Sequence, residues 1–365
     1  MRHAPSSPTA RGDGRSETSA PSPARTLRYA DTQTPGITRH RVRERFVYHD
    51  PAGKRITDRD EIARIERLAI PPAYRDVWIC ADPCGHLQAT GRDARGRLQY
   101  RYHRDWIAQR SADKYCRVAA FGHALPRIRA AVEADLARGG LDRDTVMATV
   151  VALLDQTFVR IGNARYRREN RSFGLTTLED RHVEVRRDRI GFRFRGKGGI
   201  AYRVDVAHRR LAAIVRRCRD LPGQALFQYL DDAGGVHPVT SDDVNAYLRT
   251  HGGEFTAKDF RTWAGSVRAL TNLRTAAAAA GADAPDPTVV TRVVADVAHA
   301  LGNTPAVCRK CYIHPRVIDA YLDGTLAALP RVRGRRFLAR DEAALLALLA
   351  RDASDCAKPV ARGTA

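Results

Sequence analysis

Apolar residues alternate with polar ones over short stretches in the first third of the chain. Each stretch is bounded by a turn rich in Gly, Pro or Asp, which is the pattern of β-strands. The predicted strands lie at residues 45–48, 76–80 and 98–102. Asp58 stands where a helix cap is expected, and residues 58–68 predict one short helix between the strands. We therefore expect a small, mainly β domain over residues 27–112.

After residue 113, apolar positions recur at intervals of three and four residues, the period of an amphipathic helix. The predicted helices cover residues 125–137, 144–159, 207–217, 241–250, 257–279, 287–301, 315–322 and 341–350. Three alternating stretches predict a short three-stranded antiparallel sheet. They lie at residues 182–185, 189–194 and 201–206. The pattern therefore predicts an α+β fold in which a larger, mainly helical domain covers residues 113–330.

The two ends of the chain lack this order. Residues 1–26 are rich in Pro, Ser, Gly and Arg without apolar periodicity, which predicts a disordered basic tail. Residues 331–365 follow the second domain as a C-terminal extension. No apolar run approaches 18 residues, so we expect no segment that spans a membrane.

The charge balance indicates the class of partner. Lys and Arg number 62 against 41 Asp and Glu, a net charge of +21. Such an excess opposes compaction by self-repulsion, and it is typical of proteins that bind a polyanion. A GC-rich genome would explain why Arg outnumbers Lys, but not the net excess. Because the Arg fork matches phosphate oxygens, the composition favours nucleic-acid binding.

The seven cysteines are odd in number and scattered, and no apolar leader precedes them. They indicate free thiols, and therefore a protein of the reducing cytoplasm. If its partner is DNA, we expect the protein to be associated with the nucleoid. Cys308 and Cys311 have the spacing of a zinc knuckle, and Cys80, Cys84 and His86 form a second short cluster. A structural zinc site normally needs two pairs with a repeated spacing. We therefore expect no bound metal, and no phosphate-binding Gly loop indicates another cofactor.

Four side chains are candidates for chemistry on a phosphodiester, and two of them stand in unusual settings. Arg160 and Arg261 each lie between apolar or aromatic neighbours, where a cation is costly unless it meets an anion. Lys197 stands on the Gly-rich turn at 196–199; a solvated lysine is the ordinary interpretation, although such turns can approach a bound backbone closely. Tyr312 on its own would be interpreted as a packing residue.

Five motifs occur in one order along the chain. They are Val-Arg-Ile-Gly-Asn-Ala-Arg-Tyr at 159–166, Phe-Gly-Leu-Thr-Thr-Leu at 173–178, Gly-Lys at 196–197, Lys-Asp-Phe-Arg-Thr-Trp at 258–263, and Leu-Gly-Asn-Thr-Pro at 301–305 with Arg-Lys-Cys-Tyr at 309–312. With them, residues 45 to about 326 resemble type IB DNA topoisomerases of the poxvirus and bacterial group. The resemblance implies a monomer whose β domain and helical catalytic domain close around duplex DNA. It also implies relaxation of supercoils by transient cleavage and religation of one strand.

The same resemblance assigns roles to individual residues. Tyr312 matches the nucleophile, which forms a 3′-phosphotyrosyl bond and frees a 5′-hydroxyl. Arg160 and Arg261 match the two arginines on the scissile phosphate, and Lys197 matches the acid that protonates the leaving oxygen. Asn303 stands where poxviral and nuclear members have a His; an amide can donate a hydrogen bond to a non-bridging oxygen but carries no charge.

Further positions match DNA contacts of the family. Three of them belong to a strand that touches the major groove and three lie near the active phosphate or the adjacent backbone. They are Gln99, Tyr100 and Tyr102 in the first group, and Arg165, Tyr166 and Lys258 in the second. For Tyr100 and Tyr102, one face of an ordinary strand remains an alternative.

The residue types are consistent with a reaction that needs neither ATP nor a metal ion. A phenol with a pKa of about 10 is mostly neutral at pH 7, so cations must favour the phenolate as it forms. The phosphotyrosyl bond then conserves the energy needed for religation. The chemistry fits a nucleophile with three cationic partners.

Two alternatives use part of the same evidence. A tyrosine recombinase shares the Arg, Lys, Arg and Tyr chemistry, but usually has a His three residues before the second Arg, where this chain has Lys258, and a helical N-terminal domain. A non-enzymatic architectural DNA-binding protein would explain the charge but not five ordered motifs. Substitution of Tyr312 separates the enzymes from the binding protein.

Overall fold

The computed structural model describes residues 26–281 and 284–350. The predicted disordered tail, except residue 26, and the last part of the predicted C-terminal extension lie outside these residues. The chain divides into two compact units, Met1–Ala112 and Asp113–Ala365. The predicted α+β class, with a β-rich first part, a mainly helical second part and a small three-stranded sheet, is confirmed.

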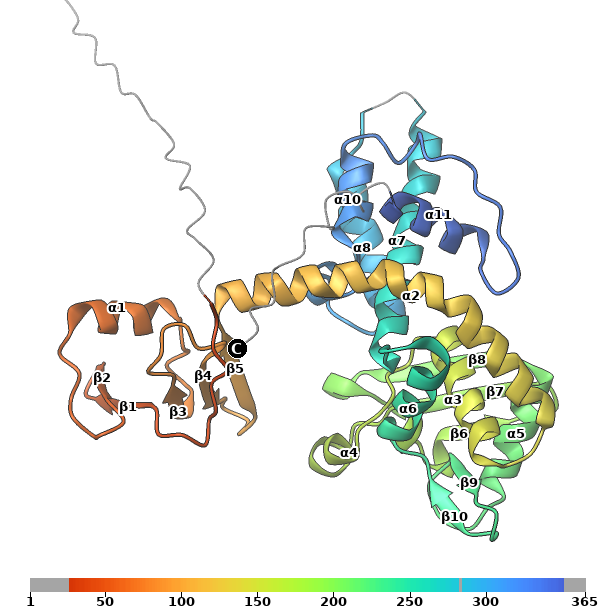
Figure 1. Ribbon diagram of the computed structural model, residues 1–365, viewed down its shortest axis with the longest axis horizontal. Helices are drawn as coiled ribbons and strands as arrows, with labels where there is room; N and C mark the ends of the chain where they lie inside the picture. Colours follow the sequence, from red (N-terminus) through yellow and green to blue (C-terminus); the bar gives the residue numbers. More distant parts are fainter. Residues whose placement is uncertain (1–25, 282–283, 351–365) are drawn as a thin grey trace, which may run out of the picture. The chain divides into compact units, whose positions relative to one another are not determined.

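The first unit is a five-stranded antiparallel sheet with one helix (Figure 1). Its elements are β1 (Ile37–Val42), β2 (Arg45–His49), α1 (Arg59–Arg67), β3 (Arg75–Ile79), β4 (Leu87–Arg92) and β5 (Leu98–Tyr102). The strand order is β2-β1-β3-β4-β5. Asp58 caps α1 as predicted, accepting a hydrogen bond from the backbone N–H of Asp60. A small core forms where Ile65 of α1 packs with Ile37, Val77 and Ile79 of the sheet.

The second unit is organised around a helix that is buried on all sides. Its first elements are α2 (Arg104–Arg138), which begins before the boundary between the units, α3 (Arg143–Thr157) and α4 (Ala164–Asn170). Every residue of α3 from Thr145 to Leu154 is buried. Both threonine hydroxyls inside this run have a local partner: Thr149 donates to the Thr145 carbonyl at 2.9 Å, and Thr145 donates to the Asp142 carboxylate at 2.7 Å. This central helix packs against β8 (Ala201–Ala207), β9 (Gln228–Leu230), α5 (Arg209–Arg219), α6 (Ser241–Gly252) and α7 (Ala257–Ala280).

A three-stranded antiparallel sheet packs against α3 and α5. Its strands are β6 (Val183–Val185), β7 (Arg189–Arg195) and β8 (Ala201–Ala207), followed by α5 (Arg209–Arg219). Seven residue pairs join β7 to β8, from Arg189 with Ala207 to Arg195 with Ala201. The predicted turn therefore becomes the tip of a long hairpin at Gly196–Ile200.

The remaining helices assemble around α7 (Figure 1). The later elements are β9 (Gln228–Leu230), β10 (Val236–Pro238), α6 (Ser241–Gly252), α7 (Ala257–Ala280), α8 (Pro287–Leu301), α9 (Pro305–Cys311), α10 (Pro315–Leu322) and α11 (Arg340–Ala350). α8, α10 and α11 each pack against α7, and α9 packs against α8. Leu301 at the end of α8 and Tyr312, which follows α9, thereby lie next to Gly265 of α7.

An ion-pair cluster ties α11 into this unit. Arg129 of α2 makes paired hydrogen bonds to Asp155 of α3, at 2.7 and 2.9 Å, and to Glu342 of α11, at 2.7 and 2.8 Å. The indole N–H of Trp263 in α7 also donates to Glu342, at 2.9 Å. The described part of the predicted C-terminal extension thus packs against α7 and α10 and is ion-paired to α2.

Candidate active site

The backbone of Arg160 is fixed between α3 and α4 by a second segment. Phe158 ends α3 in the left-handed conformation (φ 56°), which turns the chain out of the helix. The carbonyl of Arg160 then accepts the backbone N–H of Leu175 at 2.9 Å. A Cβ on Gly174 would lie 2.5 Å from that same carbonyl, so only glycine allows the two segments to approach so closely. The motifs at 159–166 and 173–178 therefore form one local structure.

The guanidinium of Arg160 is held by two side chains. One terminal nitrogen donates to the Tyr202 hydroxyl at 2.7 Å, and the other donates to Asn303 Oδ1 at 2.5 Å. Because a guanidinium can only donate, the amide oxygen of Asn303 must face Arg160. The amide nitrogen of Asn303 keeps only a 3.4 Å contact with the Leu301 carbonyl. That nitrogen is the group with capacity left to donate to an anion.

Arg261 lies deeper, in the second turn of α7, and is 3% exposed. Its two terminal nitrogens donate to the carbonyls of Phe158 and Leu301, the latter at 2.6 Å. Its Nε is buried without a hydrogen-bond partner among the described residues. Burial lowers the pKa of this guanidinium and the charge of Arg160 lowers it further, while Tyr312 opposes both. A buried cation compensated only by neutral acceptors is the environment that an anion would stabilise.

Tyr312 ends α9 with its ring against this cation. The centre of the ring is 5.1 Å from Arg261 Cζ. The tyrosine is partly buried, and its backbone is clamped against α7. A Cβ on Gly265 would lie 2.4 Å from the Tyr312 carbonyl oxygen, and the Ser266 hydroxyl donates to the same oxygen at 3.5 Å. The packing of α9 on α7 thus fixes the distance between Tyr312 and Arg261.

Side chains of α2 satisfy the C-terminal carbonyls of α9, which have no partner within the helix. Lys114 Nζ donates to the carbonyl of Cys311, and the Tyr115 hydroxyl donates to that of Lys310 at 2.8 Å. Burial lowers the pKa of Lys114 and raises the pKa of Tyr115 to about 12. These contacts hold the turn that carries Tyr312 in place from the opposite side.

Lys197 has a different environment. It stands at the tip of the β7–β8 hairpin with an exposed side chain, followed by Gly198 and Gly199 at φ 79° and 78°. Its Nζ lies 5.6 Å from the centre of the Tyr166 ring. Among the described residues, no hydrogen bond or ion pair joins it to another side chain. The structure therefore brings Arg160, Arg261, Asn303 and Tyr312 together, but does not join Lys197 to them.

The predicted DNA contacts in the first unit lie on β5. Tyr100 and Tyr102 are 50% and 43% exposed, and their rings stack with centres 6.1 Å apart at an angle of 15°. Gln99, on the opposite face, is partly buried and donates to Asp93 at 3.0 Å. The two tyrosines thus form an exposed aromatic face, whereas the amide of Gln99 is already engaged.

The other predicted DNA contacts are exposed side chains of the second unit. Arg165 and Tyr166 lie on α4, where Arg165 forms an exposed ion pair with Glu169 at 2.7 Å and Tyr166 is 47% exposed. Lys258 is exposed in the first turn of α7, three residues before Arg261.

The sequence interpretation missed Tyr202, which lies on β8. Its ring stacks on Phe194 of β7, with centres 5.2 Å apart at 4°. Its hydroxyl, besides accepting from Arg160, lies 3.3 Å from the Leu301 carbonyl and 3.4 Å from that of Gly302. In the sequence Tyr202 is one inward position of an alternating strand, and no motif sets it apart.

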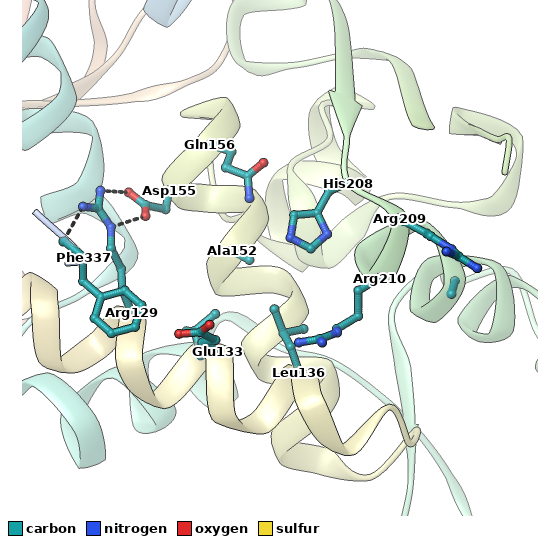
Figure 2. A pocket seen from close by; sticks show the side chains of 12 residues that line it. Arg129, Glu133, Leu136, Ala152, Asp155, Gln156, His208, Arg209, Arg210 and Phe337 are labelled. Carbon is teal, nitrogen blue, oxygen red and sulfur yellow. Dashed lines mark hydrogen bonds and ion pairs between the residues drawn. The ribbon is translucent and has the colours of Figure 1, made fainter. Parts of the chain in front are cut away.

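Two hollows lie in the second unit. The larger, of about 820 Å³, opens between α2, α3 and α5, with Arg129 at one end and Gln156, His208 and Arg210 along its wall (Figure 2). None of the predicted site residues lines it. The smaller, of about 620 Å³, lies along the β7–β8 hairpin and includes Tyr202. Over the described ranges, no three His, Cys, Asp or Glu side chains are placed to hold a metal ion, and no helix is long and apolar enough to cross a membrane.

Comparison with known proteins identifies the family of this chain. Residues 103–329 match the family model described as eukaryotic DNA topoisomerase I, catalytic core, and residues 45–93 match that of the bacterial DNA topoisomerase IB N-terminal domain. The chain is 30% identical to DNA topoisomerase 1B of Acanthamoeba polyphaga mimivirus over 237 residues, which are 64% of this chain and 70% of that protein. It is 22% identical to DNA topoisomerase 1B of Vaccinia virus (strain Western Reserve) over 268 residues, 71% of this chain and 81% of that protein. The chain therefore belongs to the type IB DNA topoisomerase family, whose members are enzymes that act on DNA.

Proposed function

We propose that the protein relaxes supercoiled duplex DNA by cleaving one strand through a 3′-phosphotyrosyl intermediate at Tyr312 and then religating it. The observation that carries the proposal is the buried Arg261 beneath the Tyr312 ring, with its Nε unpartnered among the described residues. A phosphodiester brought to Tyr312 would meet this cation together with Arg160 and Asn303. Each of the three can donate to an anionic oxygen.

The division of labour follows from these positions. Tyr312 Oη gives its proton to water and attacks phosphorus, while the two guanidiniums favour the phenolate and meet the charge that grows on the non-bridging oxygens. The free amide nitrogen of Asn303 donates to one of those oxygens. Because this donor is neutral, it contributes orientation and a hydrogen bond rather than charge.

Lys197 is proposed as the general acid that protonates the leaving 5′-oxygen. Its exposed position on the hairpin tip is consistent with a group that reaches the reacting atoms only when DNA is bound, since catalytic hydrogen bonds often form only in the substrate complex. Religation reverses the steps: the 5′-hydroxyl attacks the phosphotyrosine and the phenolate leaves. The bond energy is conserved throughout, so we propose that neither ATP nor a metal ion is required.

The protein is proposed to act as a monomer that encloses duplex DNA, at the nucleoid in the cytoplasm. Tyr100 and Tyr102 of the first unit and the exposed Arg165, Tyr166 and Lys258 of the second are the proposed DNA contacts, with Gln99 as a further one once its bond to Asp93 is exchanged. The net charge of +21 supports this, because phosphate neutralisation supplies much of the affinity for DNA.

The test is plasmid relaxation with EDTA present and ATP absent, comparing wild type, Tyr312→Phe and Tyr321→Phe. Tyr321 is a buried tyrosine of α10, nine residues further along, and serves as the matched loss of a hydroxyl. We expect Tyr312→Phe to abolish relaxation while DNA binding survives, and Tyr321→Phe to relax DNA normally. Relaxation by Tyr312→Phe at the wild-type rate would overturn the proposal.

A further inference from the structure

Tyr202 lies in the site, between Arg160 and the end of α8, but has no role in the proposed reaction. Its hydroxyl accepts a hydrogen bond from Arg160 at 2.7 Å and can donate to the carbonyl of Leu301 or of Gly302. The Leu301 carbonyl also accepts from Arg261, at 2.6 Å. A continuous chain of hydrogen bonds thus runs from Arg160 through Tyr202 and the end of α8 to Arg261.

The placement of this hydroxyl is enforced by packing on both sides. The left-handed Gly302 (φ 58°) leaves no room for a side chain: a Cβ there would lie 2.1 Å from the Tyr202 oxygen. On the other side, the ring stacks on Phe194. A Cβ on Gly196 would lie 2.4 Å from the same ring, so the residue directly before Lys197 is also built against it.

The guanidiniums of Arg160 and Arg261, which these hydrogen bonds connect, repel each other. The repulsion lowers the pKa of Arg261. Without a fixed acceptor, Arg160 would turn toward solvent, because it is only half-buried and lies in a segment without regular structure. Asn303 supplies one acceptor, but its amide is also proposed to serve the phosphate. Tyr202 is the side-chain acceptor of Arg160 that has no other proposed role.

We infer that Tyr202 is a positioning residue for DNA cleavage, which holds the guanidinium of Arg160 in the orientation that meets the scissile phosphate. The inference rests on the proposed function of Arg160 and Tyr312. It assigns no contact between Tyr202 and DNA. Its effect on cleavage is transmitted through the hydrogen bond to Arg160.

The test is a kinetic double-mutant cycle measured by single-turnover cleavage at saturating DNA. Tyr202→Phe keeps the ring, its stack on Phe194 and its contact with Gly196, and removes only the hydroxyl. We expect the cleavage rate to fall about 10- to 100-fold, because small misplacements of a catalytic group cost about this much. DNA affinity should stay unchanged.

The cycle separates positioning from general support of the fold. In an Arg160→Ala background, with product followed over hours, Tyr202→Phe should cause no further loss, since the group it positions is absent. In a Lys197→Ala background, the two losses should multiply. Tyr247→Phe is the matched control. It also removes a hydroxyl, one that donates to Asp135 at 2.6 Å and lies away from the site. It should leave the cleavage rate unchanged.

Two failures can be told apart. If Tyr202→Phe cleaves at the wild-type rate, or loses as much rate in the Arg160→Ala background as in wild type, the positioning role is wrong. If Arg160→Ala and Tyr312→Phe themselves cleave normally, the proposed function is wrong.

Discussion

The candidate site has two sides that are built in opposite ways. On the arginine side, Arg261 is buried, Arg160 is bonded to Tyr202 and Asn303, and the backbone of Tyr312 is clamped against α7. On the lysine side, Lys197 is exposed on a glycine turn and contacts only the ring of Tyr166 among the described residues. The difference matches the two tasks: cations that stabilise charge act best when fixed in advance, whereas an acid need only reach the leaving oxygen in the complex.

The support of the arginine side extends far from the reacting atoms. Trp263, two residues after Arg261, donates to Glu342 of α11, which in turn pairs with Arg129 of α2. Substitutions should therefore separate the two sides: loss of the buried catalytic arginine should lower activity and stability together, and loss of Lys197 should lower activity alone.

The largest effect is expected from Arg261→Ala. Loss of a preorganised donor should lower the cleavage rate about a thousandfold. The Phe158 carbonyl would lose the donor that Arg261 supplies, and the Leu301 carbonyl would keep only its longer contacts with Tyr202 and Asn303, which should destabilise the fold by about 1–3 kcal/mol. Single-turnover cleavage and urea unfolding measure the two effects. Arg268→Ala, an exposed arginine of the same helix, is the control and should change neither. A stable Arg261→Ala protein would break the comparison.

Lys197→Ala should lower the cleavage rate about a hundredfold, the loss typical of a missing general acid. Its unfolding free energy should equal that of wild type, because the side chain is exposed and makes no hydrogen bond with the described residues. A substrate with sulfur in place of the leaving 5′-oxygen needs no acid, so it should restore the rate of Lys197→Ala but not that of Arg160→Ala. Equal rescue of both variants would contradict the separate roles.

Glu342→Gln tests the remote support of the arginine side. The carboxylate accepts from Arg129, Trp263 and the backbone of Ala339, so its neutralisation should destabilise the fold by about 2 kcal/mol. Cleavage by the folded protein should be retained. The control is Glu133→Gln, which breaks the exposed pair with Arg336 and should cost at most about 0.5 kcal/mol. Equal stability of the two variants, by urea unfolding, would show that α11 does not support the site.

The smallest expected effect is on the pH dependence of the unfolding free energy, through His182 near the β7–β8 hairpin. Burial lowers the pKa of His182 below its usual 6.5, partly opposed by Glu179, and its ring packs 4.3 Å from that of Phe173 beside the hairpin. Because the unfolded chain then binds the proton more tightly, stability should rise with pH through the window just below 6.5. His182→Asn, whose amide oxygen can replace the ring acceptor for the Glu179 N–H, should flatten this slope. Unfolding free energies at several pH values between 5 and 8 measure it, and an unchanged slope would reject the assignment.

Much of the fold followed from periodicity, and the exceptions have physical reasons. β5, β7, β8 and the later helices were predicted because apolar or aromatic residues recur in each at the period of a strand or a helix. β4 was missed since it is buried on both faces and contains Gln88 and Gly91, so nothing alternates. The first half of α2 was missed because its exposed residues carry no apolar stripe.

The site was predicted from ordered motifs, and the roles assigned to its residues stay predictions. The sequence did not predict the contact between Tyr202 and the residues at the end of α8. Tyr202 meets the carbonyl of Gly302 across 100 residues of chain, through a glycine whose missing side chain makes the space. Neither an aromatic residue in a strand nor a glycine after a helix reveals its partner until the fold joins them.

The central claim is that Tyr312 becomes covalently linked to the 3′ end of the cleaved strand. The most direct measurement uses a duplex labelled at the 5′ end of the cleaved strand, with the 3′ portion free to dissociate. After denaturation, wild type and Tyr321→Phe should carry the label, and Tyr312→Phe should not. Labelling of Tyr312→Phe at the wild-type level, or attachment of the fragment on the other side of the break, would contradict the account.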